Sequence, residues 1–231
     1  MTENGCFGAK KGRVGRVNFN LYHYAGNNPV KYTDPDGREI YIDGDDAYRT
    51  AVLDSIKKLA PNAKFDEKRA GYIILGDGHT PKGCETGTAL IKKLVENPNK
   101  VTISQNKNSN ADFWSSMSKV KGNSCIPGNA ELMRNGIACN AHVQFNLKNE
   151  TLDNGFGQKD WKPDLCFSLA HELIHAMHIF QGNRHPSLEQ EEIRTCQETN
   201  AIIGEMRGAG LTTTQNRMGY NFNGRYLRIP Q

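Results

Sequence analysis

The apolar positions in the first half of the chain follow two spacings, one typical of strands and one typical of helices. Apolar residues at alternate positions predict β-strands at 39–43, 71–75 and 101–104, because alternate residues of a strand face the same side of a sheet. Helical spacing predicts helices near residues 45–60 and 86–96. The sequence therefore predicts a mixed α/β arrangement in this region.

The first predicted helix has a clear apolar face and a candidate cap. The residues on that face are Tyr48, Val52, Ile56 and Leu59. Asp45 or Asp46 is expected to cap the N-terminus, since a carboxylate there accepts hydrogen bonds from the free backbone N–H groups of the first turn.

A strand followed by a long helix is predicted in the second half of the chain. Residues 106–137 are rich in Gly, Ser and Asn and are expected to form loops. Alternation predicts a half-buried strand within 139–148, and Pro163 suits the first turn of the next helix. The buried face of that helix is predicted to contain Leu165, Leu169, Leu173 and Met177. With no internal repeat, these elements indicate one α+β domain with a small mixed sheet.

Charge and composition exclude several classes of function. The 29 basic residues are interleaved with 25 acidic ones rather than gathered into a basic patch, so we expect no nucleic-acid partner. No run approaches the roughly 18 apolar residues that a membrane-spanning helix needs. The six cysteines form no C-x-x-C pair, and Cys166 and Cys196 are expected to be small buried residues of helices.

The pentapeptide HELIH at 171–175 is the strongest chemical signal in the sequence. On a helix, His171 and His175 lie one turn apart and only about 40° around the axis from each other, so both imidazoles can bind one zinc ion. Glu172 is then expected to be the general base that takes a proton from the metal-bound water and passes it to the leaving amine. His178 is open to three interpretations: a fourth ligand, a residue supporting the ligands, or a surface histidine.

A hydrolytic zinc site needs a third protein ligand and an open position. The metzincin pattern is excluded, because it requires Gly at position 178 and His at position 181, where this chain has His178 and Gln181. Ser187 and Gln190 form a candidate capping box for a second helix. The glutamates of that helix are the natural candidates for the third ligand, and sequence alone leaves four of them open: Glu189, Glu191, Glu192 and Glu198.

The run HELIHAMH at 171–178, followed by EEIRT at 191–195, resembles the zinc site of the clostridial neurotoxin light chains. The resemblance implies that Glu192 is the third ligand, that Glu191 supports the ligands from behind, and that Arg194 is structural. A further match to the R-x-x-Y element of those toxins is RMGY, which assigns the stabilisation of the oxyanion and of the scissile carbonyl to Arg217 and Tyr220.

The chain also resembles the short zinc peptidases that enteric pathogens inject into host cells, such as the NleD-like effectors. Both resemblances imply a zincin-like metallopeptidase fold of the gluzincin type, with the H-E-x-x-H motif on the active-site helix. In such a fold the strand before the motif helix lines the active-site cleft. We therefore expect residues 139–148 to offer an edge to which an extended substrate adds as a further strand.

The segment NLYHYAGNNPVKYTDPDG at 20–37 closely resembles the end of the conserved core of RHS-repeat proteins. In that family a large β-rich shell encloses a variable C-terminal toxin, which self-cleavage near the Asp-Pro-x-Gly turn releases. The resemblance implies that residues 1–38 end such a core and that 39–231 are a metallopeptidase toxin domain. It also implies a protein secreted or delivered into a target cell, with an upstream RHS shell, a protein substrate and a cognate immunity protein as partners.

Two alternatives stay open beside a zinc endopeptidase toxin. One is a self-processing peptidase that trims its own RHS carrier, and the other is a non-catalytic binding module stabilised by zinc. Intact Glu172 argues against the second alternative. A nuclease or ADP-ribosylating toxin is disfavoured, because the sequence contains neither G-x-x-x-x-G-K-[ST] nor G-x-G-x-x-G.

Overall fold

The computed structural model describes residues 39–105, 123–147, 163–222 and 225–230. The segment predicted to end an RHS core, residues 1–38, lies outside the described residues. No helix in the described part of the chain is long and apolar enough to span a membrane.

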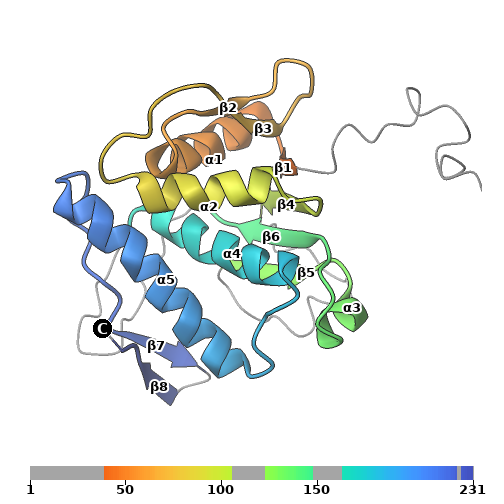
Figure 1. The fold of residues 1–231 in the computed structure, drawn as a ribbon, viewed down its shortest axis with the longest axis vertical. Coiled ribbons are helices and arrows are strands. Elements are labelled where there is room, and N and C mark those ends of the chain that lie inside the picture. The colour runs from red at the N-terminus through yellow and green to blue at the C-terminus, as the bar shows by residue number, and fades with distance from the viewer. Residues whose placement is uncertain (1–38, 106–122, 148–162, 223–224, 231) are drawn as a thin grey trace, which may run out of the picture. The chain divides into compact units, whose positions relative to one another are not determined.

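A six-stranded mixed sheet forms the centre of the fold, in the order β2-β3-β1-β4-β6-β5 (Figure 1). Its strands are β1 (Glu39–Asp43), β2 (Ala63–Phe65), β3 (Tyr72–Leu75), β4 (Lys100–Gln105), β5 (Ser124–Pro127) and β6 (Ala141–Phe145). Strands β1, β4 and β6 are parallel neighbours, and the other pairs are antiparallel. The described chain is thus a mixed α/β structure, compatible with the predicted α+β class.

The register of the three parallel strands explains their alternating sequences. Ile42 of β1 pairs with Ile103 of β4, which pairs with Val143 of β6, and all three are fully buried. Two residues earlier in each strand, the same alignment brings together Ile40, Val101 and Ala141. One face of the sheet is therefore apolar, because alternate residues of each strand point toward the core.

Three helices pack on the sheet and on one another, as Figure 1 shows for α1 (Asp46–Leu59), α2 (Glu85–Val95) and α4 (Leu165–Phe180). A fourth, α5 (Leu188–Gly208), packs along α4 and contacts the hairpin of β7 (Gly219–Phe222) and β8 (Arg225–Arg228). The short α3 (Ala130–Arg134) follows β5. Helix α4 is thereby enclosed by the sheet and by its neighbouring helices.

The predicted cap and apolar face of α1 are both confirmed. The Asp45 carboxylate accepts a hydrogen bond from the backbone N–H of Tyr48 at 2.8 Å, and the predicted apolar residues are buried. The Tyr48 hydroxyl donates to the Phe145 carbonyl oxygen of β6 at 3.0 Å. Burial of this hydroxyl raises the pKa of Tyr48 well above its usual range.

The motif helix α4 differs from its prediction in two ways. Pro163 is not in its first turn, because Asp164 is the N-cap and Leu165 is the first helical residue. Leu169, Leu173 and Met177 are buried as predicted, whereas Leu165 is only half-buried, and burial extends almost all around the helix. The buried positions outside the predicted stripe include apolar residues such as Phe167, Ile174 and Ile179 as well as the polar residues of the motif.

The end of α4 is a tight turn that requires glycine. Gly182 has φ +62°, donates its N–H to the Ile179 carbonyl at 3.1 Å, and is followed by Asn183, whose N–H reaches the His178 carbonyl at 3.0 Å. This pair of bonds is the Schellman arrangement that commonly ends a helix. A Cβ atom at Gly182 would also lie 2.3 Å from the Gly136 carbonyl oxygen, so both backbone conformation and space require Gly there.

Two expectations about the middle of the chain are wrong. Residues 106–137 were expected to form loops, but they contain β5 and α3. Residues 139–148 were expected to offer a sheet edge, but β6 pairs with β4 on one side and β5 on the other. Within the described residues β5 is the outermost strand at that side, so an added strand has no free backbone groups on β6 to pair with.

Shortening one buried leucine of α4 should destabilise the whole domain. We expect Leu169→Ala, at a fully buried position, to lower the free energy of unfolding by about 2–5 kcal/mol through lost burial and the cavity left behind. The matched control Leu188→Ala, 53% exposed, should change it by less than about 0.5 kcal/mol. Urea denaturation followed by circular dichroism measures both, and equal effects would contradict the enclosed position of α4.

Candidate metal centre

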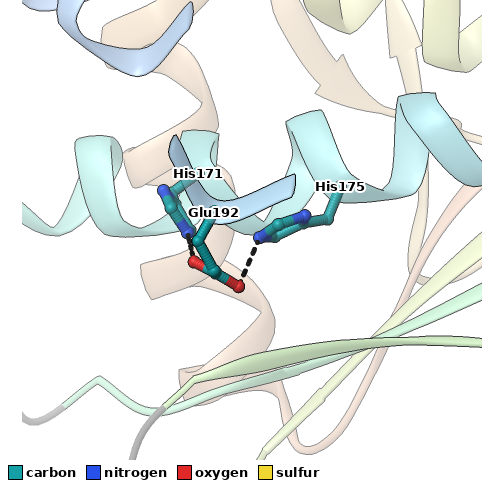
Figure 2. Close-up of side chains that lie close together, drawn as sticks. All are labelled: His171, His175 and Glu192. Carbon is teal, nitrogen blue, oxygen red and sulfur yellow. Dashed lines mark hydrogen bonds and ion pairs between the residues drawn. The ribbon is translucent and has the colours of Figure 1, made fainter. Parts of the chain in front are cut away.

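Three side chains from α4 and α5 converge on one point (Figure 2). His171 Nε2 lies 3.2 Å from Glu192 Oε2, and His175 Nε2 lies 3.2 Å from Glu192 Oε1. His171 and His175 are one turn apart on α4, as the motif spacing predicts, while Glu192 comes from the second turn of α5. Of the four glutamates left open by sequence, Glu192 is the one that faces both motif histidines.

The separations of these donor atoms suit a tetrahedral metal ion. Their ligand atoms all lie within 4.8 Å of one another. Two ligands of a tetrahedral zinc ion, each about 2.0–2.1 Å from the metal, are about 3.3 Å apart, close to the observed nitrogen–oxygen separations. Two imidazoles and a carboxylate fit zinc, and they accept other divalent ions as well.

Burial and mutual contact set the charges of the three groups. Burial alone would raise the pKa of Glu192, but hydrogen bonds from His171 and His175 hold it far below its usual range. Burial disfavours the charged form of His175, yet its bonds to Glu191 and Glu192 outweigh this and raise its pKa to about 9. Burial lowers the pKa of His171. Protons and a metal ion compete for the same imidazole lone pairs, so metal binding is linked to proton release.

A second buried carboxylate lies behind the first. Glu191 Oε1 is 3.0 Å from His175 Nδ1 and 2.7 Å from His178 Nδ1, and all three side chains are buried. Thr195 Oγ1 also lies 3.2 Å from His175 Nδ1. When His175 Nδ1–H donates to Glu191, its Nε2 lone pair is left for a metal. Glu191 therefore orients His175, in the supporting role that the resemblance assigned to it.

His178 is neither exposed nor directed at Glu192. Its Nδ1 contacts Glu191 and its Nε2 lies 3.1 Å from Glu198 Oε1. Glu198 in turn accepts a hydrogen bond from Arg194 Nε at 3.1 Å, and Arg194 also donates to the Asn183 carbonyl at 3.2 Å. This chain of contacts runs from the buried centre to the surface and binds α4, α5 and their connecting loop together.

Glu172 differs from the other acids of the site. It is buried, and it makes no hydrogen bond or ion pair with any other residue that the structure describes. Burial raises the pKa of Glu172 to about 7, although the nearby charge of His175 opposes the change. A carboxyl group with a pKa near neutrality can both accept and release a proton at physiological pH.

Arg217 also lies close enough to influence the centre. Its positive charge helps to lower the pKa of Glu172 and of His171, after the larger effects already described. Its backbone is fixed by Asn200, which donates to the Arg217 carbonyl at 2.8 Å and accepts from its N–H at 2.7 Å. The backbone of Tyr220 lies in β7, and its side chain lies outside the described part of the structure.

Sequence analysis missed two contributors to the site. Thr195 lies one turn after Glu191 on α5 and contacts His175, and Arg184, in the loop between α4 and α5, has a positive charge that opposes the larger effect of burial on the pKa of Glu172. Helical spacing places Thr195 on the same face as Glu191 and could have found it. No local pattern marks Arg184, because its position depends on how the loop is held.

Comparison with known proteins adds no relative: the chain matches no protein-family model, no curated protein and no solved structure at a significant level. The assignment of this centre therefore depends on the geometry above and on the sequence motifs.

Removing the charge of Glu191 should weaken metal binding more than removing that of Glu198. We expect Glu191→Gln to lower zinc affinity about 10–100-fold, because His175 loses the carboxylate that orients it. The partly exposed Glu198 should matter little, and Glu198→Gln should change the affinity less than about fivefold. Competition with a chromophoric chelator measures both. Similar losses in the two variants would show that Glu191 has no special role.

Proposed function

We propose that this chain is a zinc-dependent endopeptidase of zincin-like fold. The observation that carries the proposal is the convergence of His171 Nε2, His175 Nε2 and the Glu192 carboxylate beside a buried carboxyl, that of Glu172, which has no partner among the described residues. Such a set of ligands with an adjacent free acid is the arrangement that hydrolytic zinc sites use.

A zinc ion bound by these three residues would supply Lewis acidity, which polarises a peptide carbonyl and acidifies water. Side chains of the protein transfer the proton and orient the ligands. Glu172 takes a proton from the attacking water and delivers it to the leaving amine nitrogen, a task that suits a buried carboxylate next to the ligand His171. Glu191 keeps His175 in the required orientation.

Arg217 is the proposed stabiliser of negative charge in this reaction. A guanidinium near His171 and Glu172 favours an oxyanion that forms as the carbonyl is attacked. Its anchored backbone limits the reorganisation needed during the reaction. We propose that the phenol of Tyr220 stabilises the same negative charge. This role is inferred from the R-x-x-Y element alone.

The substrate is proposed to bind as an extended strand along β5. This strand packs against α4, which carries the histidines, and its outer edge has no partner strand among the described residues. Strand addition supplies backbone hydrogen bonds over several residues of a peptide. That geometry favours a cut within a chain and supports an endopeptidase.

In its biological setting we propose that the domain is the payload of a larger bacterial toxin. The support is the segment at 20–37, which resembles the end of an RHS core. The proposed protein is secreted or delivered into a target cell, where it cuts a protein substrate, and a cognate immunity protein protects the producer. Self-processing of the carrier is the competing function.

Metal content and proteolysis together test the proposal. We expect about one zinc ion per wild-type chain and a loss of that zinc in His175→Ala and Glu192→Ala, because each removes one of three ligands. Glu172→Gln should keep the zinc but lower cleavage of target-cell lysate proteins by about 10²–10⁴-fold, because the base is lost. Mass spectrometry measures both the metal and the new peptide ends.

The exposed Glu67→Gln is the matched control and should behave as the wild type. If Glu192→Ala retains its zinc, another glutamate is the third ligand. If only the processing of an RHS carrier, and no lysate protein, depends on Glu172, the chain is a self-processing peptidase. A wild-type protein that binds no metal would overturn the proposal altogether.

A further inference from the structure

Helix α5 presents a strip of three residues that links the metal centre to Arg217. Glu192, Cys196 and Asn200 are four residues apart, so each lies one turn after the previous one on nearly the same side of the helix. Glu192 faces the motif histidines. Cys196 and Asn200 are buried, and both contact Arg217. The strip therefore joins the proposed third ligand to the proposed stabiliser of negative charge.

The segment before β7 runs back along α5 toward the metal centre. Near the end of the helix, Arg207 Nη1 donates to the Thr214 carbonyl at 3.2 Å. About two turns nearer the third ligand, the Asn200 side chain holds the backbone of Arg217. One turn further, Arg217 Nη1 donates to Cys196 Sγ at 3.8 Å. These contacts place the guanidinium beside α5, against the residue that lies one turn from the third ligand.

The Asn200 side chain binds Arg217 as a neighbouring strand would. Its Oδ1 accepts from the Arg217 N–H at 2.7 Å, and its Nδ2 donates to the Arg217 carbonyl at 2.8 Å. An amide side chain carries an acceptor and a donor on adjacent atoms, so it can pair with both backbone groups of one residue. Because Asn200 is buried, little water competes for these bonds. The pair of bonds fixes the backbone of Arg217 relative to α5.

We propose that Asn200 is a positioning residue, which sets the place of the Arg217 guanidinium relative to the metal centre. The inference rests on the proposed peptidase function and adds to it a residue that acts only through Arg217. A donor stabilises a developing charge best when it already stands in place, because no reorganisation is then needed during the reaction. Asn200 supplies this order from the same strip of α5 that carries Glu192.

Combined variants test whether Asn200 acts through Arg217. Asn200→Ala, and Asn200→Leu as a variant of similar size without the polar atoms, are each made alone and together with Arg217→Gln. The matched control is Gln197→Ala, which removes an exposed amide of the same helix whose Nε2 donates to the Pro230 carbonyl at 3.5 Å. Each protein is measured for zinc content, circular dichroism, and kcat and KM on a fluorogenic peptide built from a site that the wild type cuts in lysate.

We expect Asn200→Ala to lower kcat about 10–100-fold with KM and zinc content nearly unchanged, because an interaction made mainly in the transition state is weakened. When Arg217→Gln is already present, the same change should lower kcat less than about twofold, because the group that Asn200 positions is gone. Gln197→Ala should behave as the wild type. If Asn200→Ala does not fold, Asn200→Leu provides the same comparison.

Amide hydrogen exchange, followed by NMR, tests the anchor without turnover. The Arg217 N–H should exchange at least about tenfold faster in Asn200→Ala than in the wild type, because its acceptor is lost. Equal exchange in the two proteins overturns the anchor whatever the activity. Equal losses of kcat with and without Arg217, or a loss confined to KM, overturn the positioning role while the peptidase remains. If zinc-loaded wild type cleaves no peptide although the Arg217 amide is protected, the peptidase proposal falls and this inference falls with it.

Discussion

The carboxylate of Glu191 is the contact on which the local structure most depends. It is fully buried, a position that disfavours a charge, and it is kept ionised by His175, His178 and the backbone N–H of His185. These bonds hold its pKa far below the usual range although burial alone would raise it. Because its partners belong to α4 and to the loop before α5, the helix pair can satisfy Glu191 in only one relative position.

The same contact links stability of the helix pair to the chemistry of the centre. Glu191 and Glu192 are consecutive on α5 and lie on either side of the His175 ring, one at Nδ1 and the other at Nε2. Glu191, which joins α4 to α5, therefore also determines that the Nε2 atom of His175 is the one available to a metal. A shift of α5 along α4 would break both contacts together.

Local spacing predicted those parts of the structure that depend on one element alone. His171 and His175 share a face because a helix repeats every 3.6 residues, and the buried alternation of β1, β4 and β6 follows from the strand period. The cap at Asp45 needed only its own first turn. The third ligand could not be predicted from α4 alone. Helical spacing left four glutamates of α5 open, and only the resemblance favoured Glu192.

What the sequence could not predict depends on long-range packing. Strand β5 has four residues within a polar, glycine-rich region, and it is a strand because β6 pairs with it. Arg184 resembles any loop arginine in sequence, and the position of its backbone follows from bonds made by its neighbours Asn183 and His185. The residues proposed to bind the metal thus lie in short sequence motifs. The path of the loop between α4 and α5 depends instead on long-range bonds, such as the one from the His185 N–H to the Glu191 carboxylate.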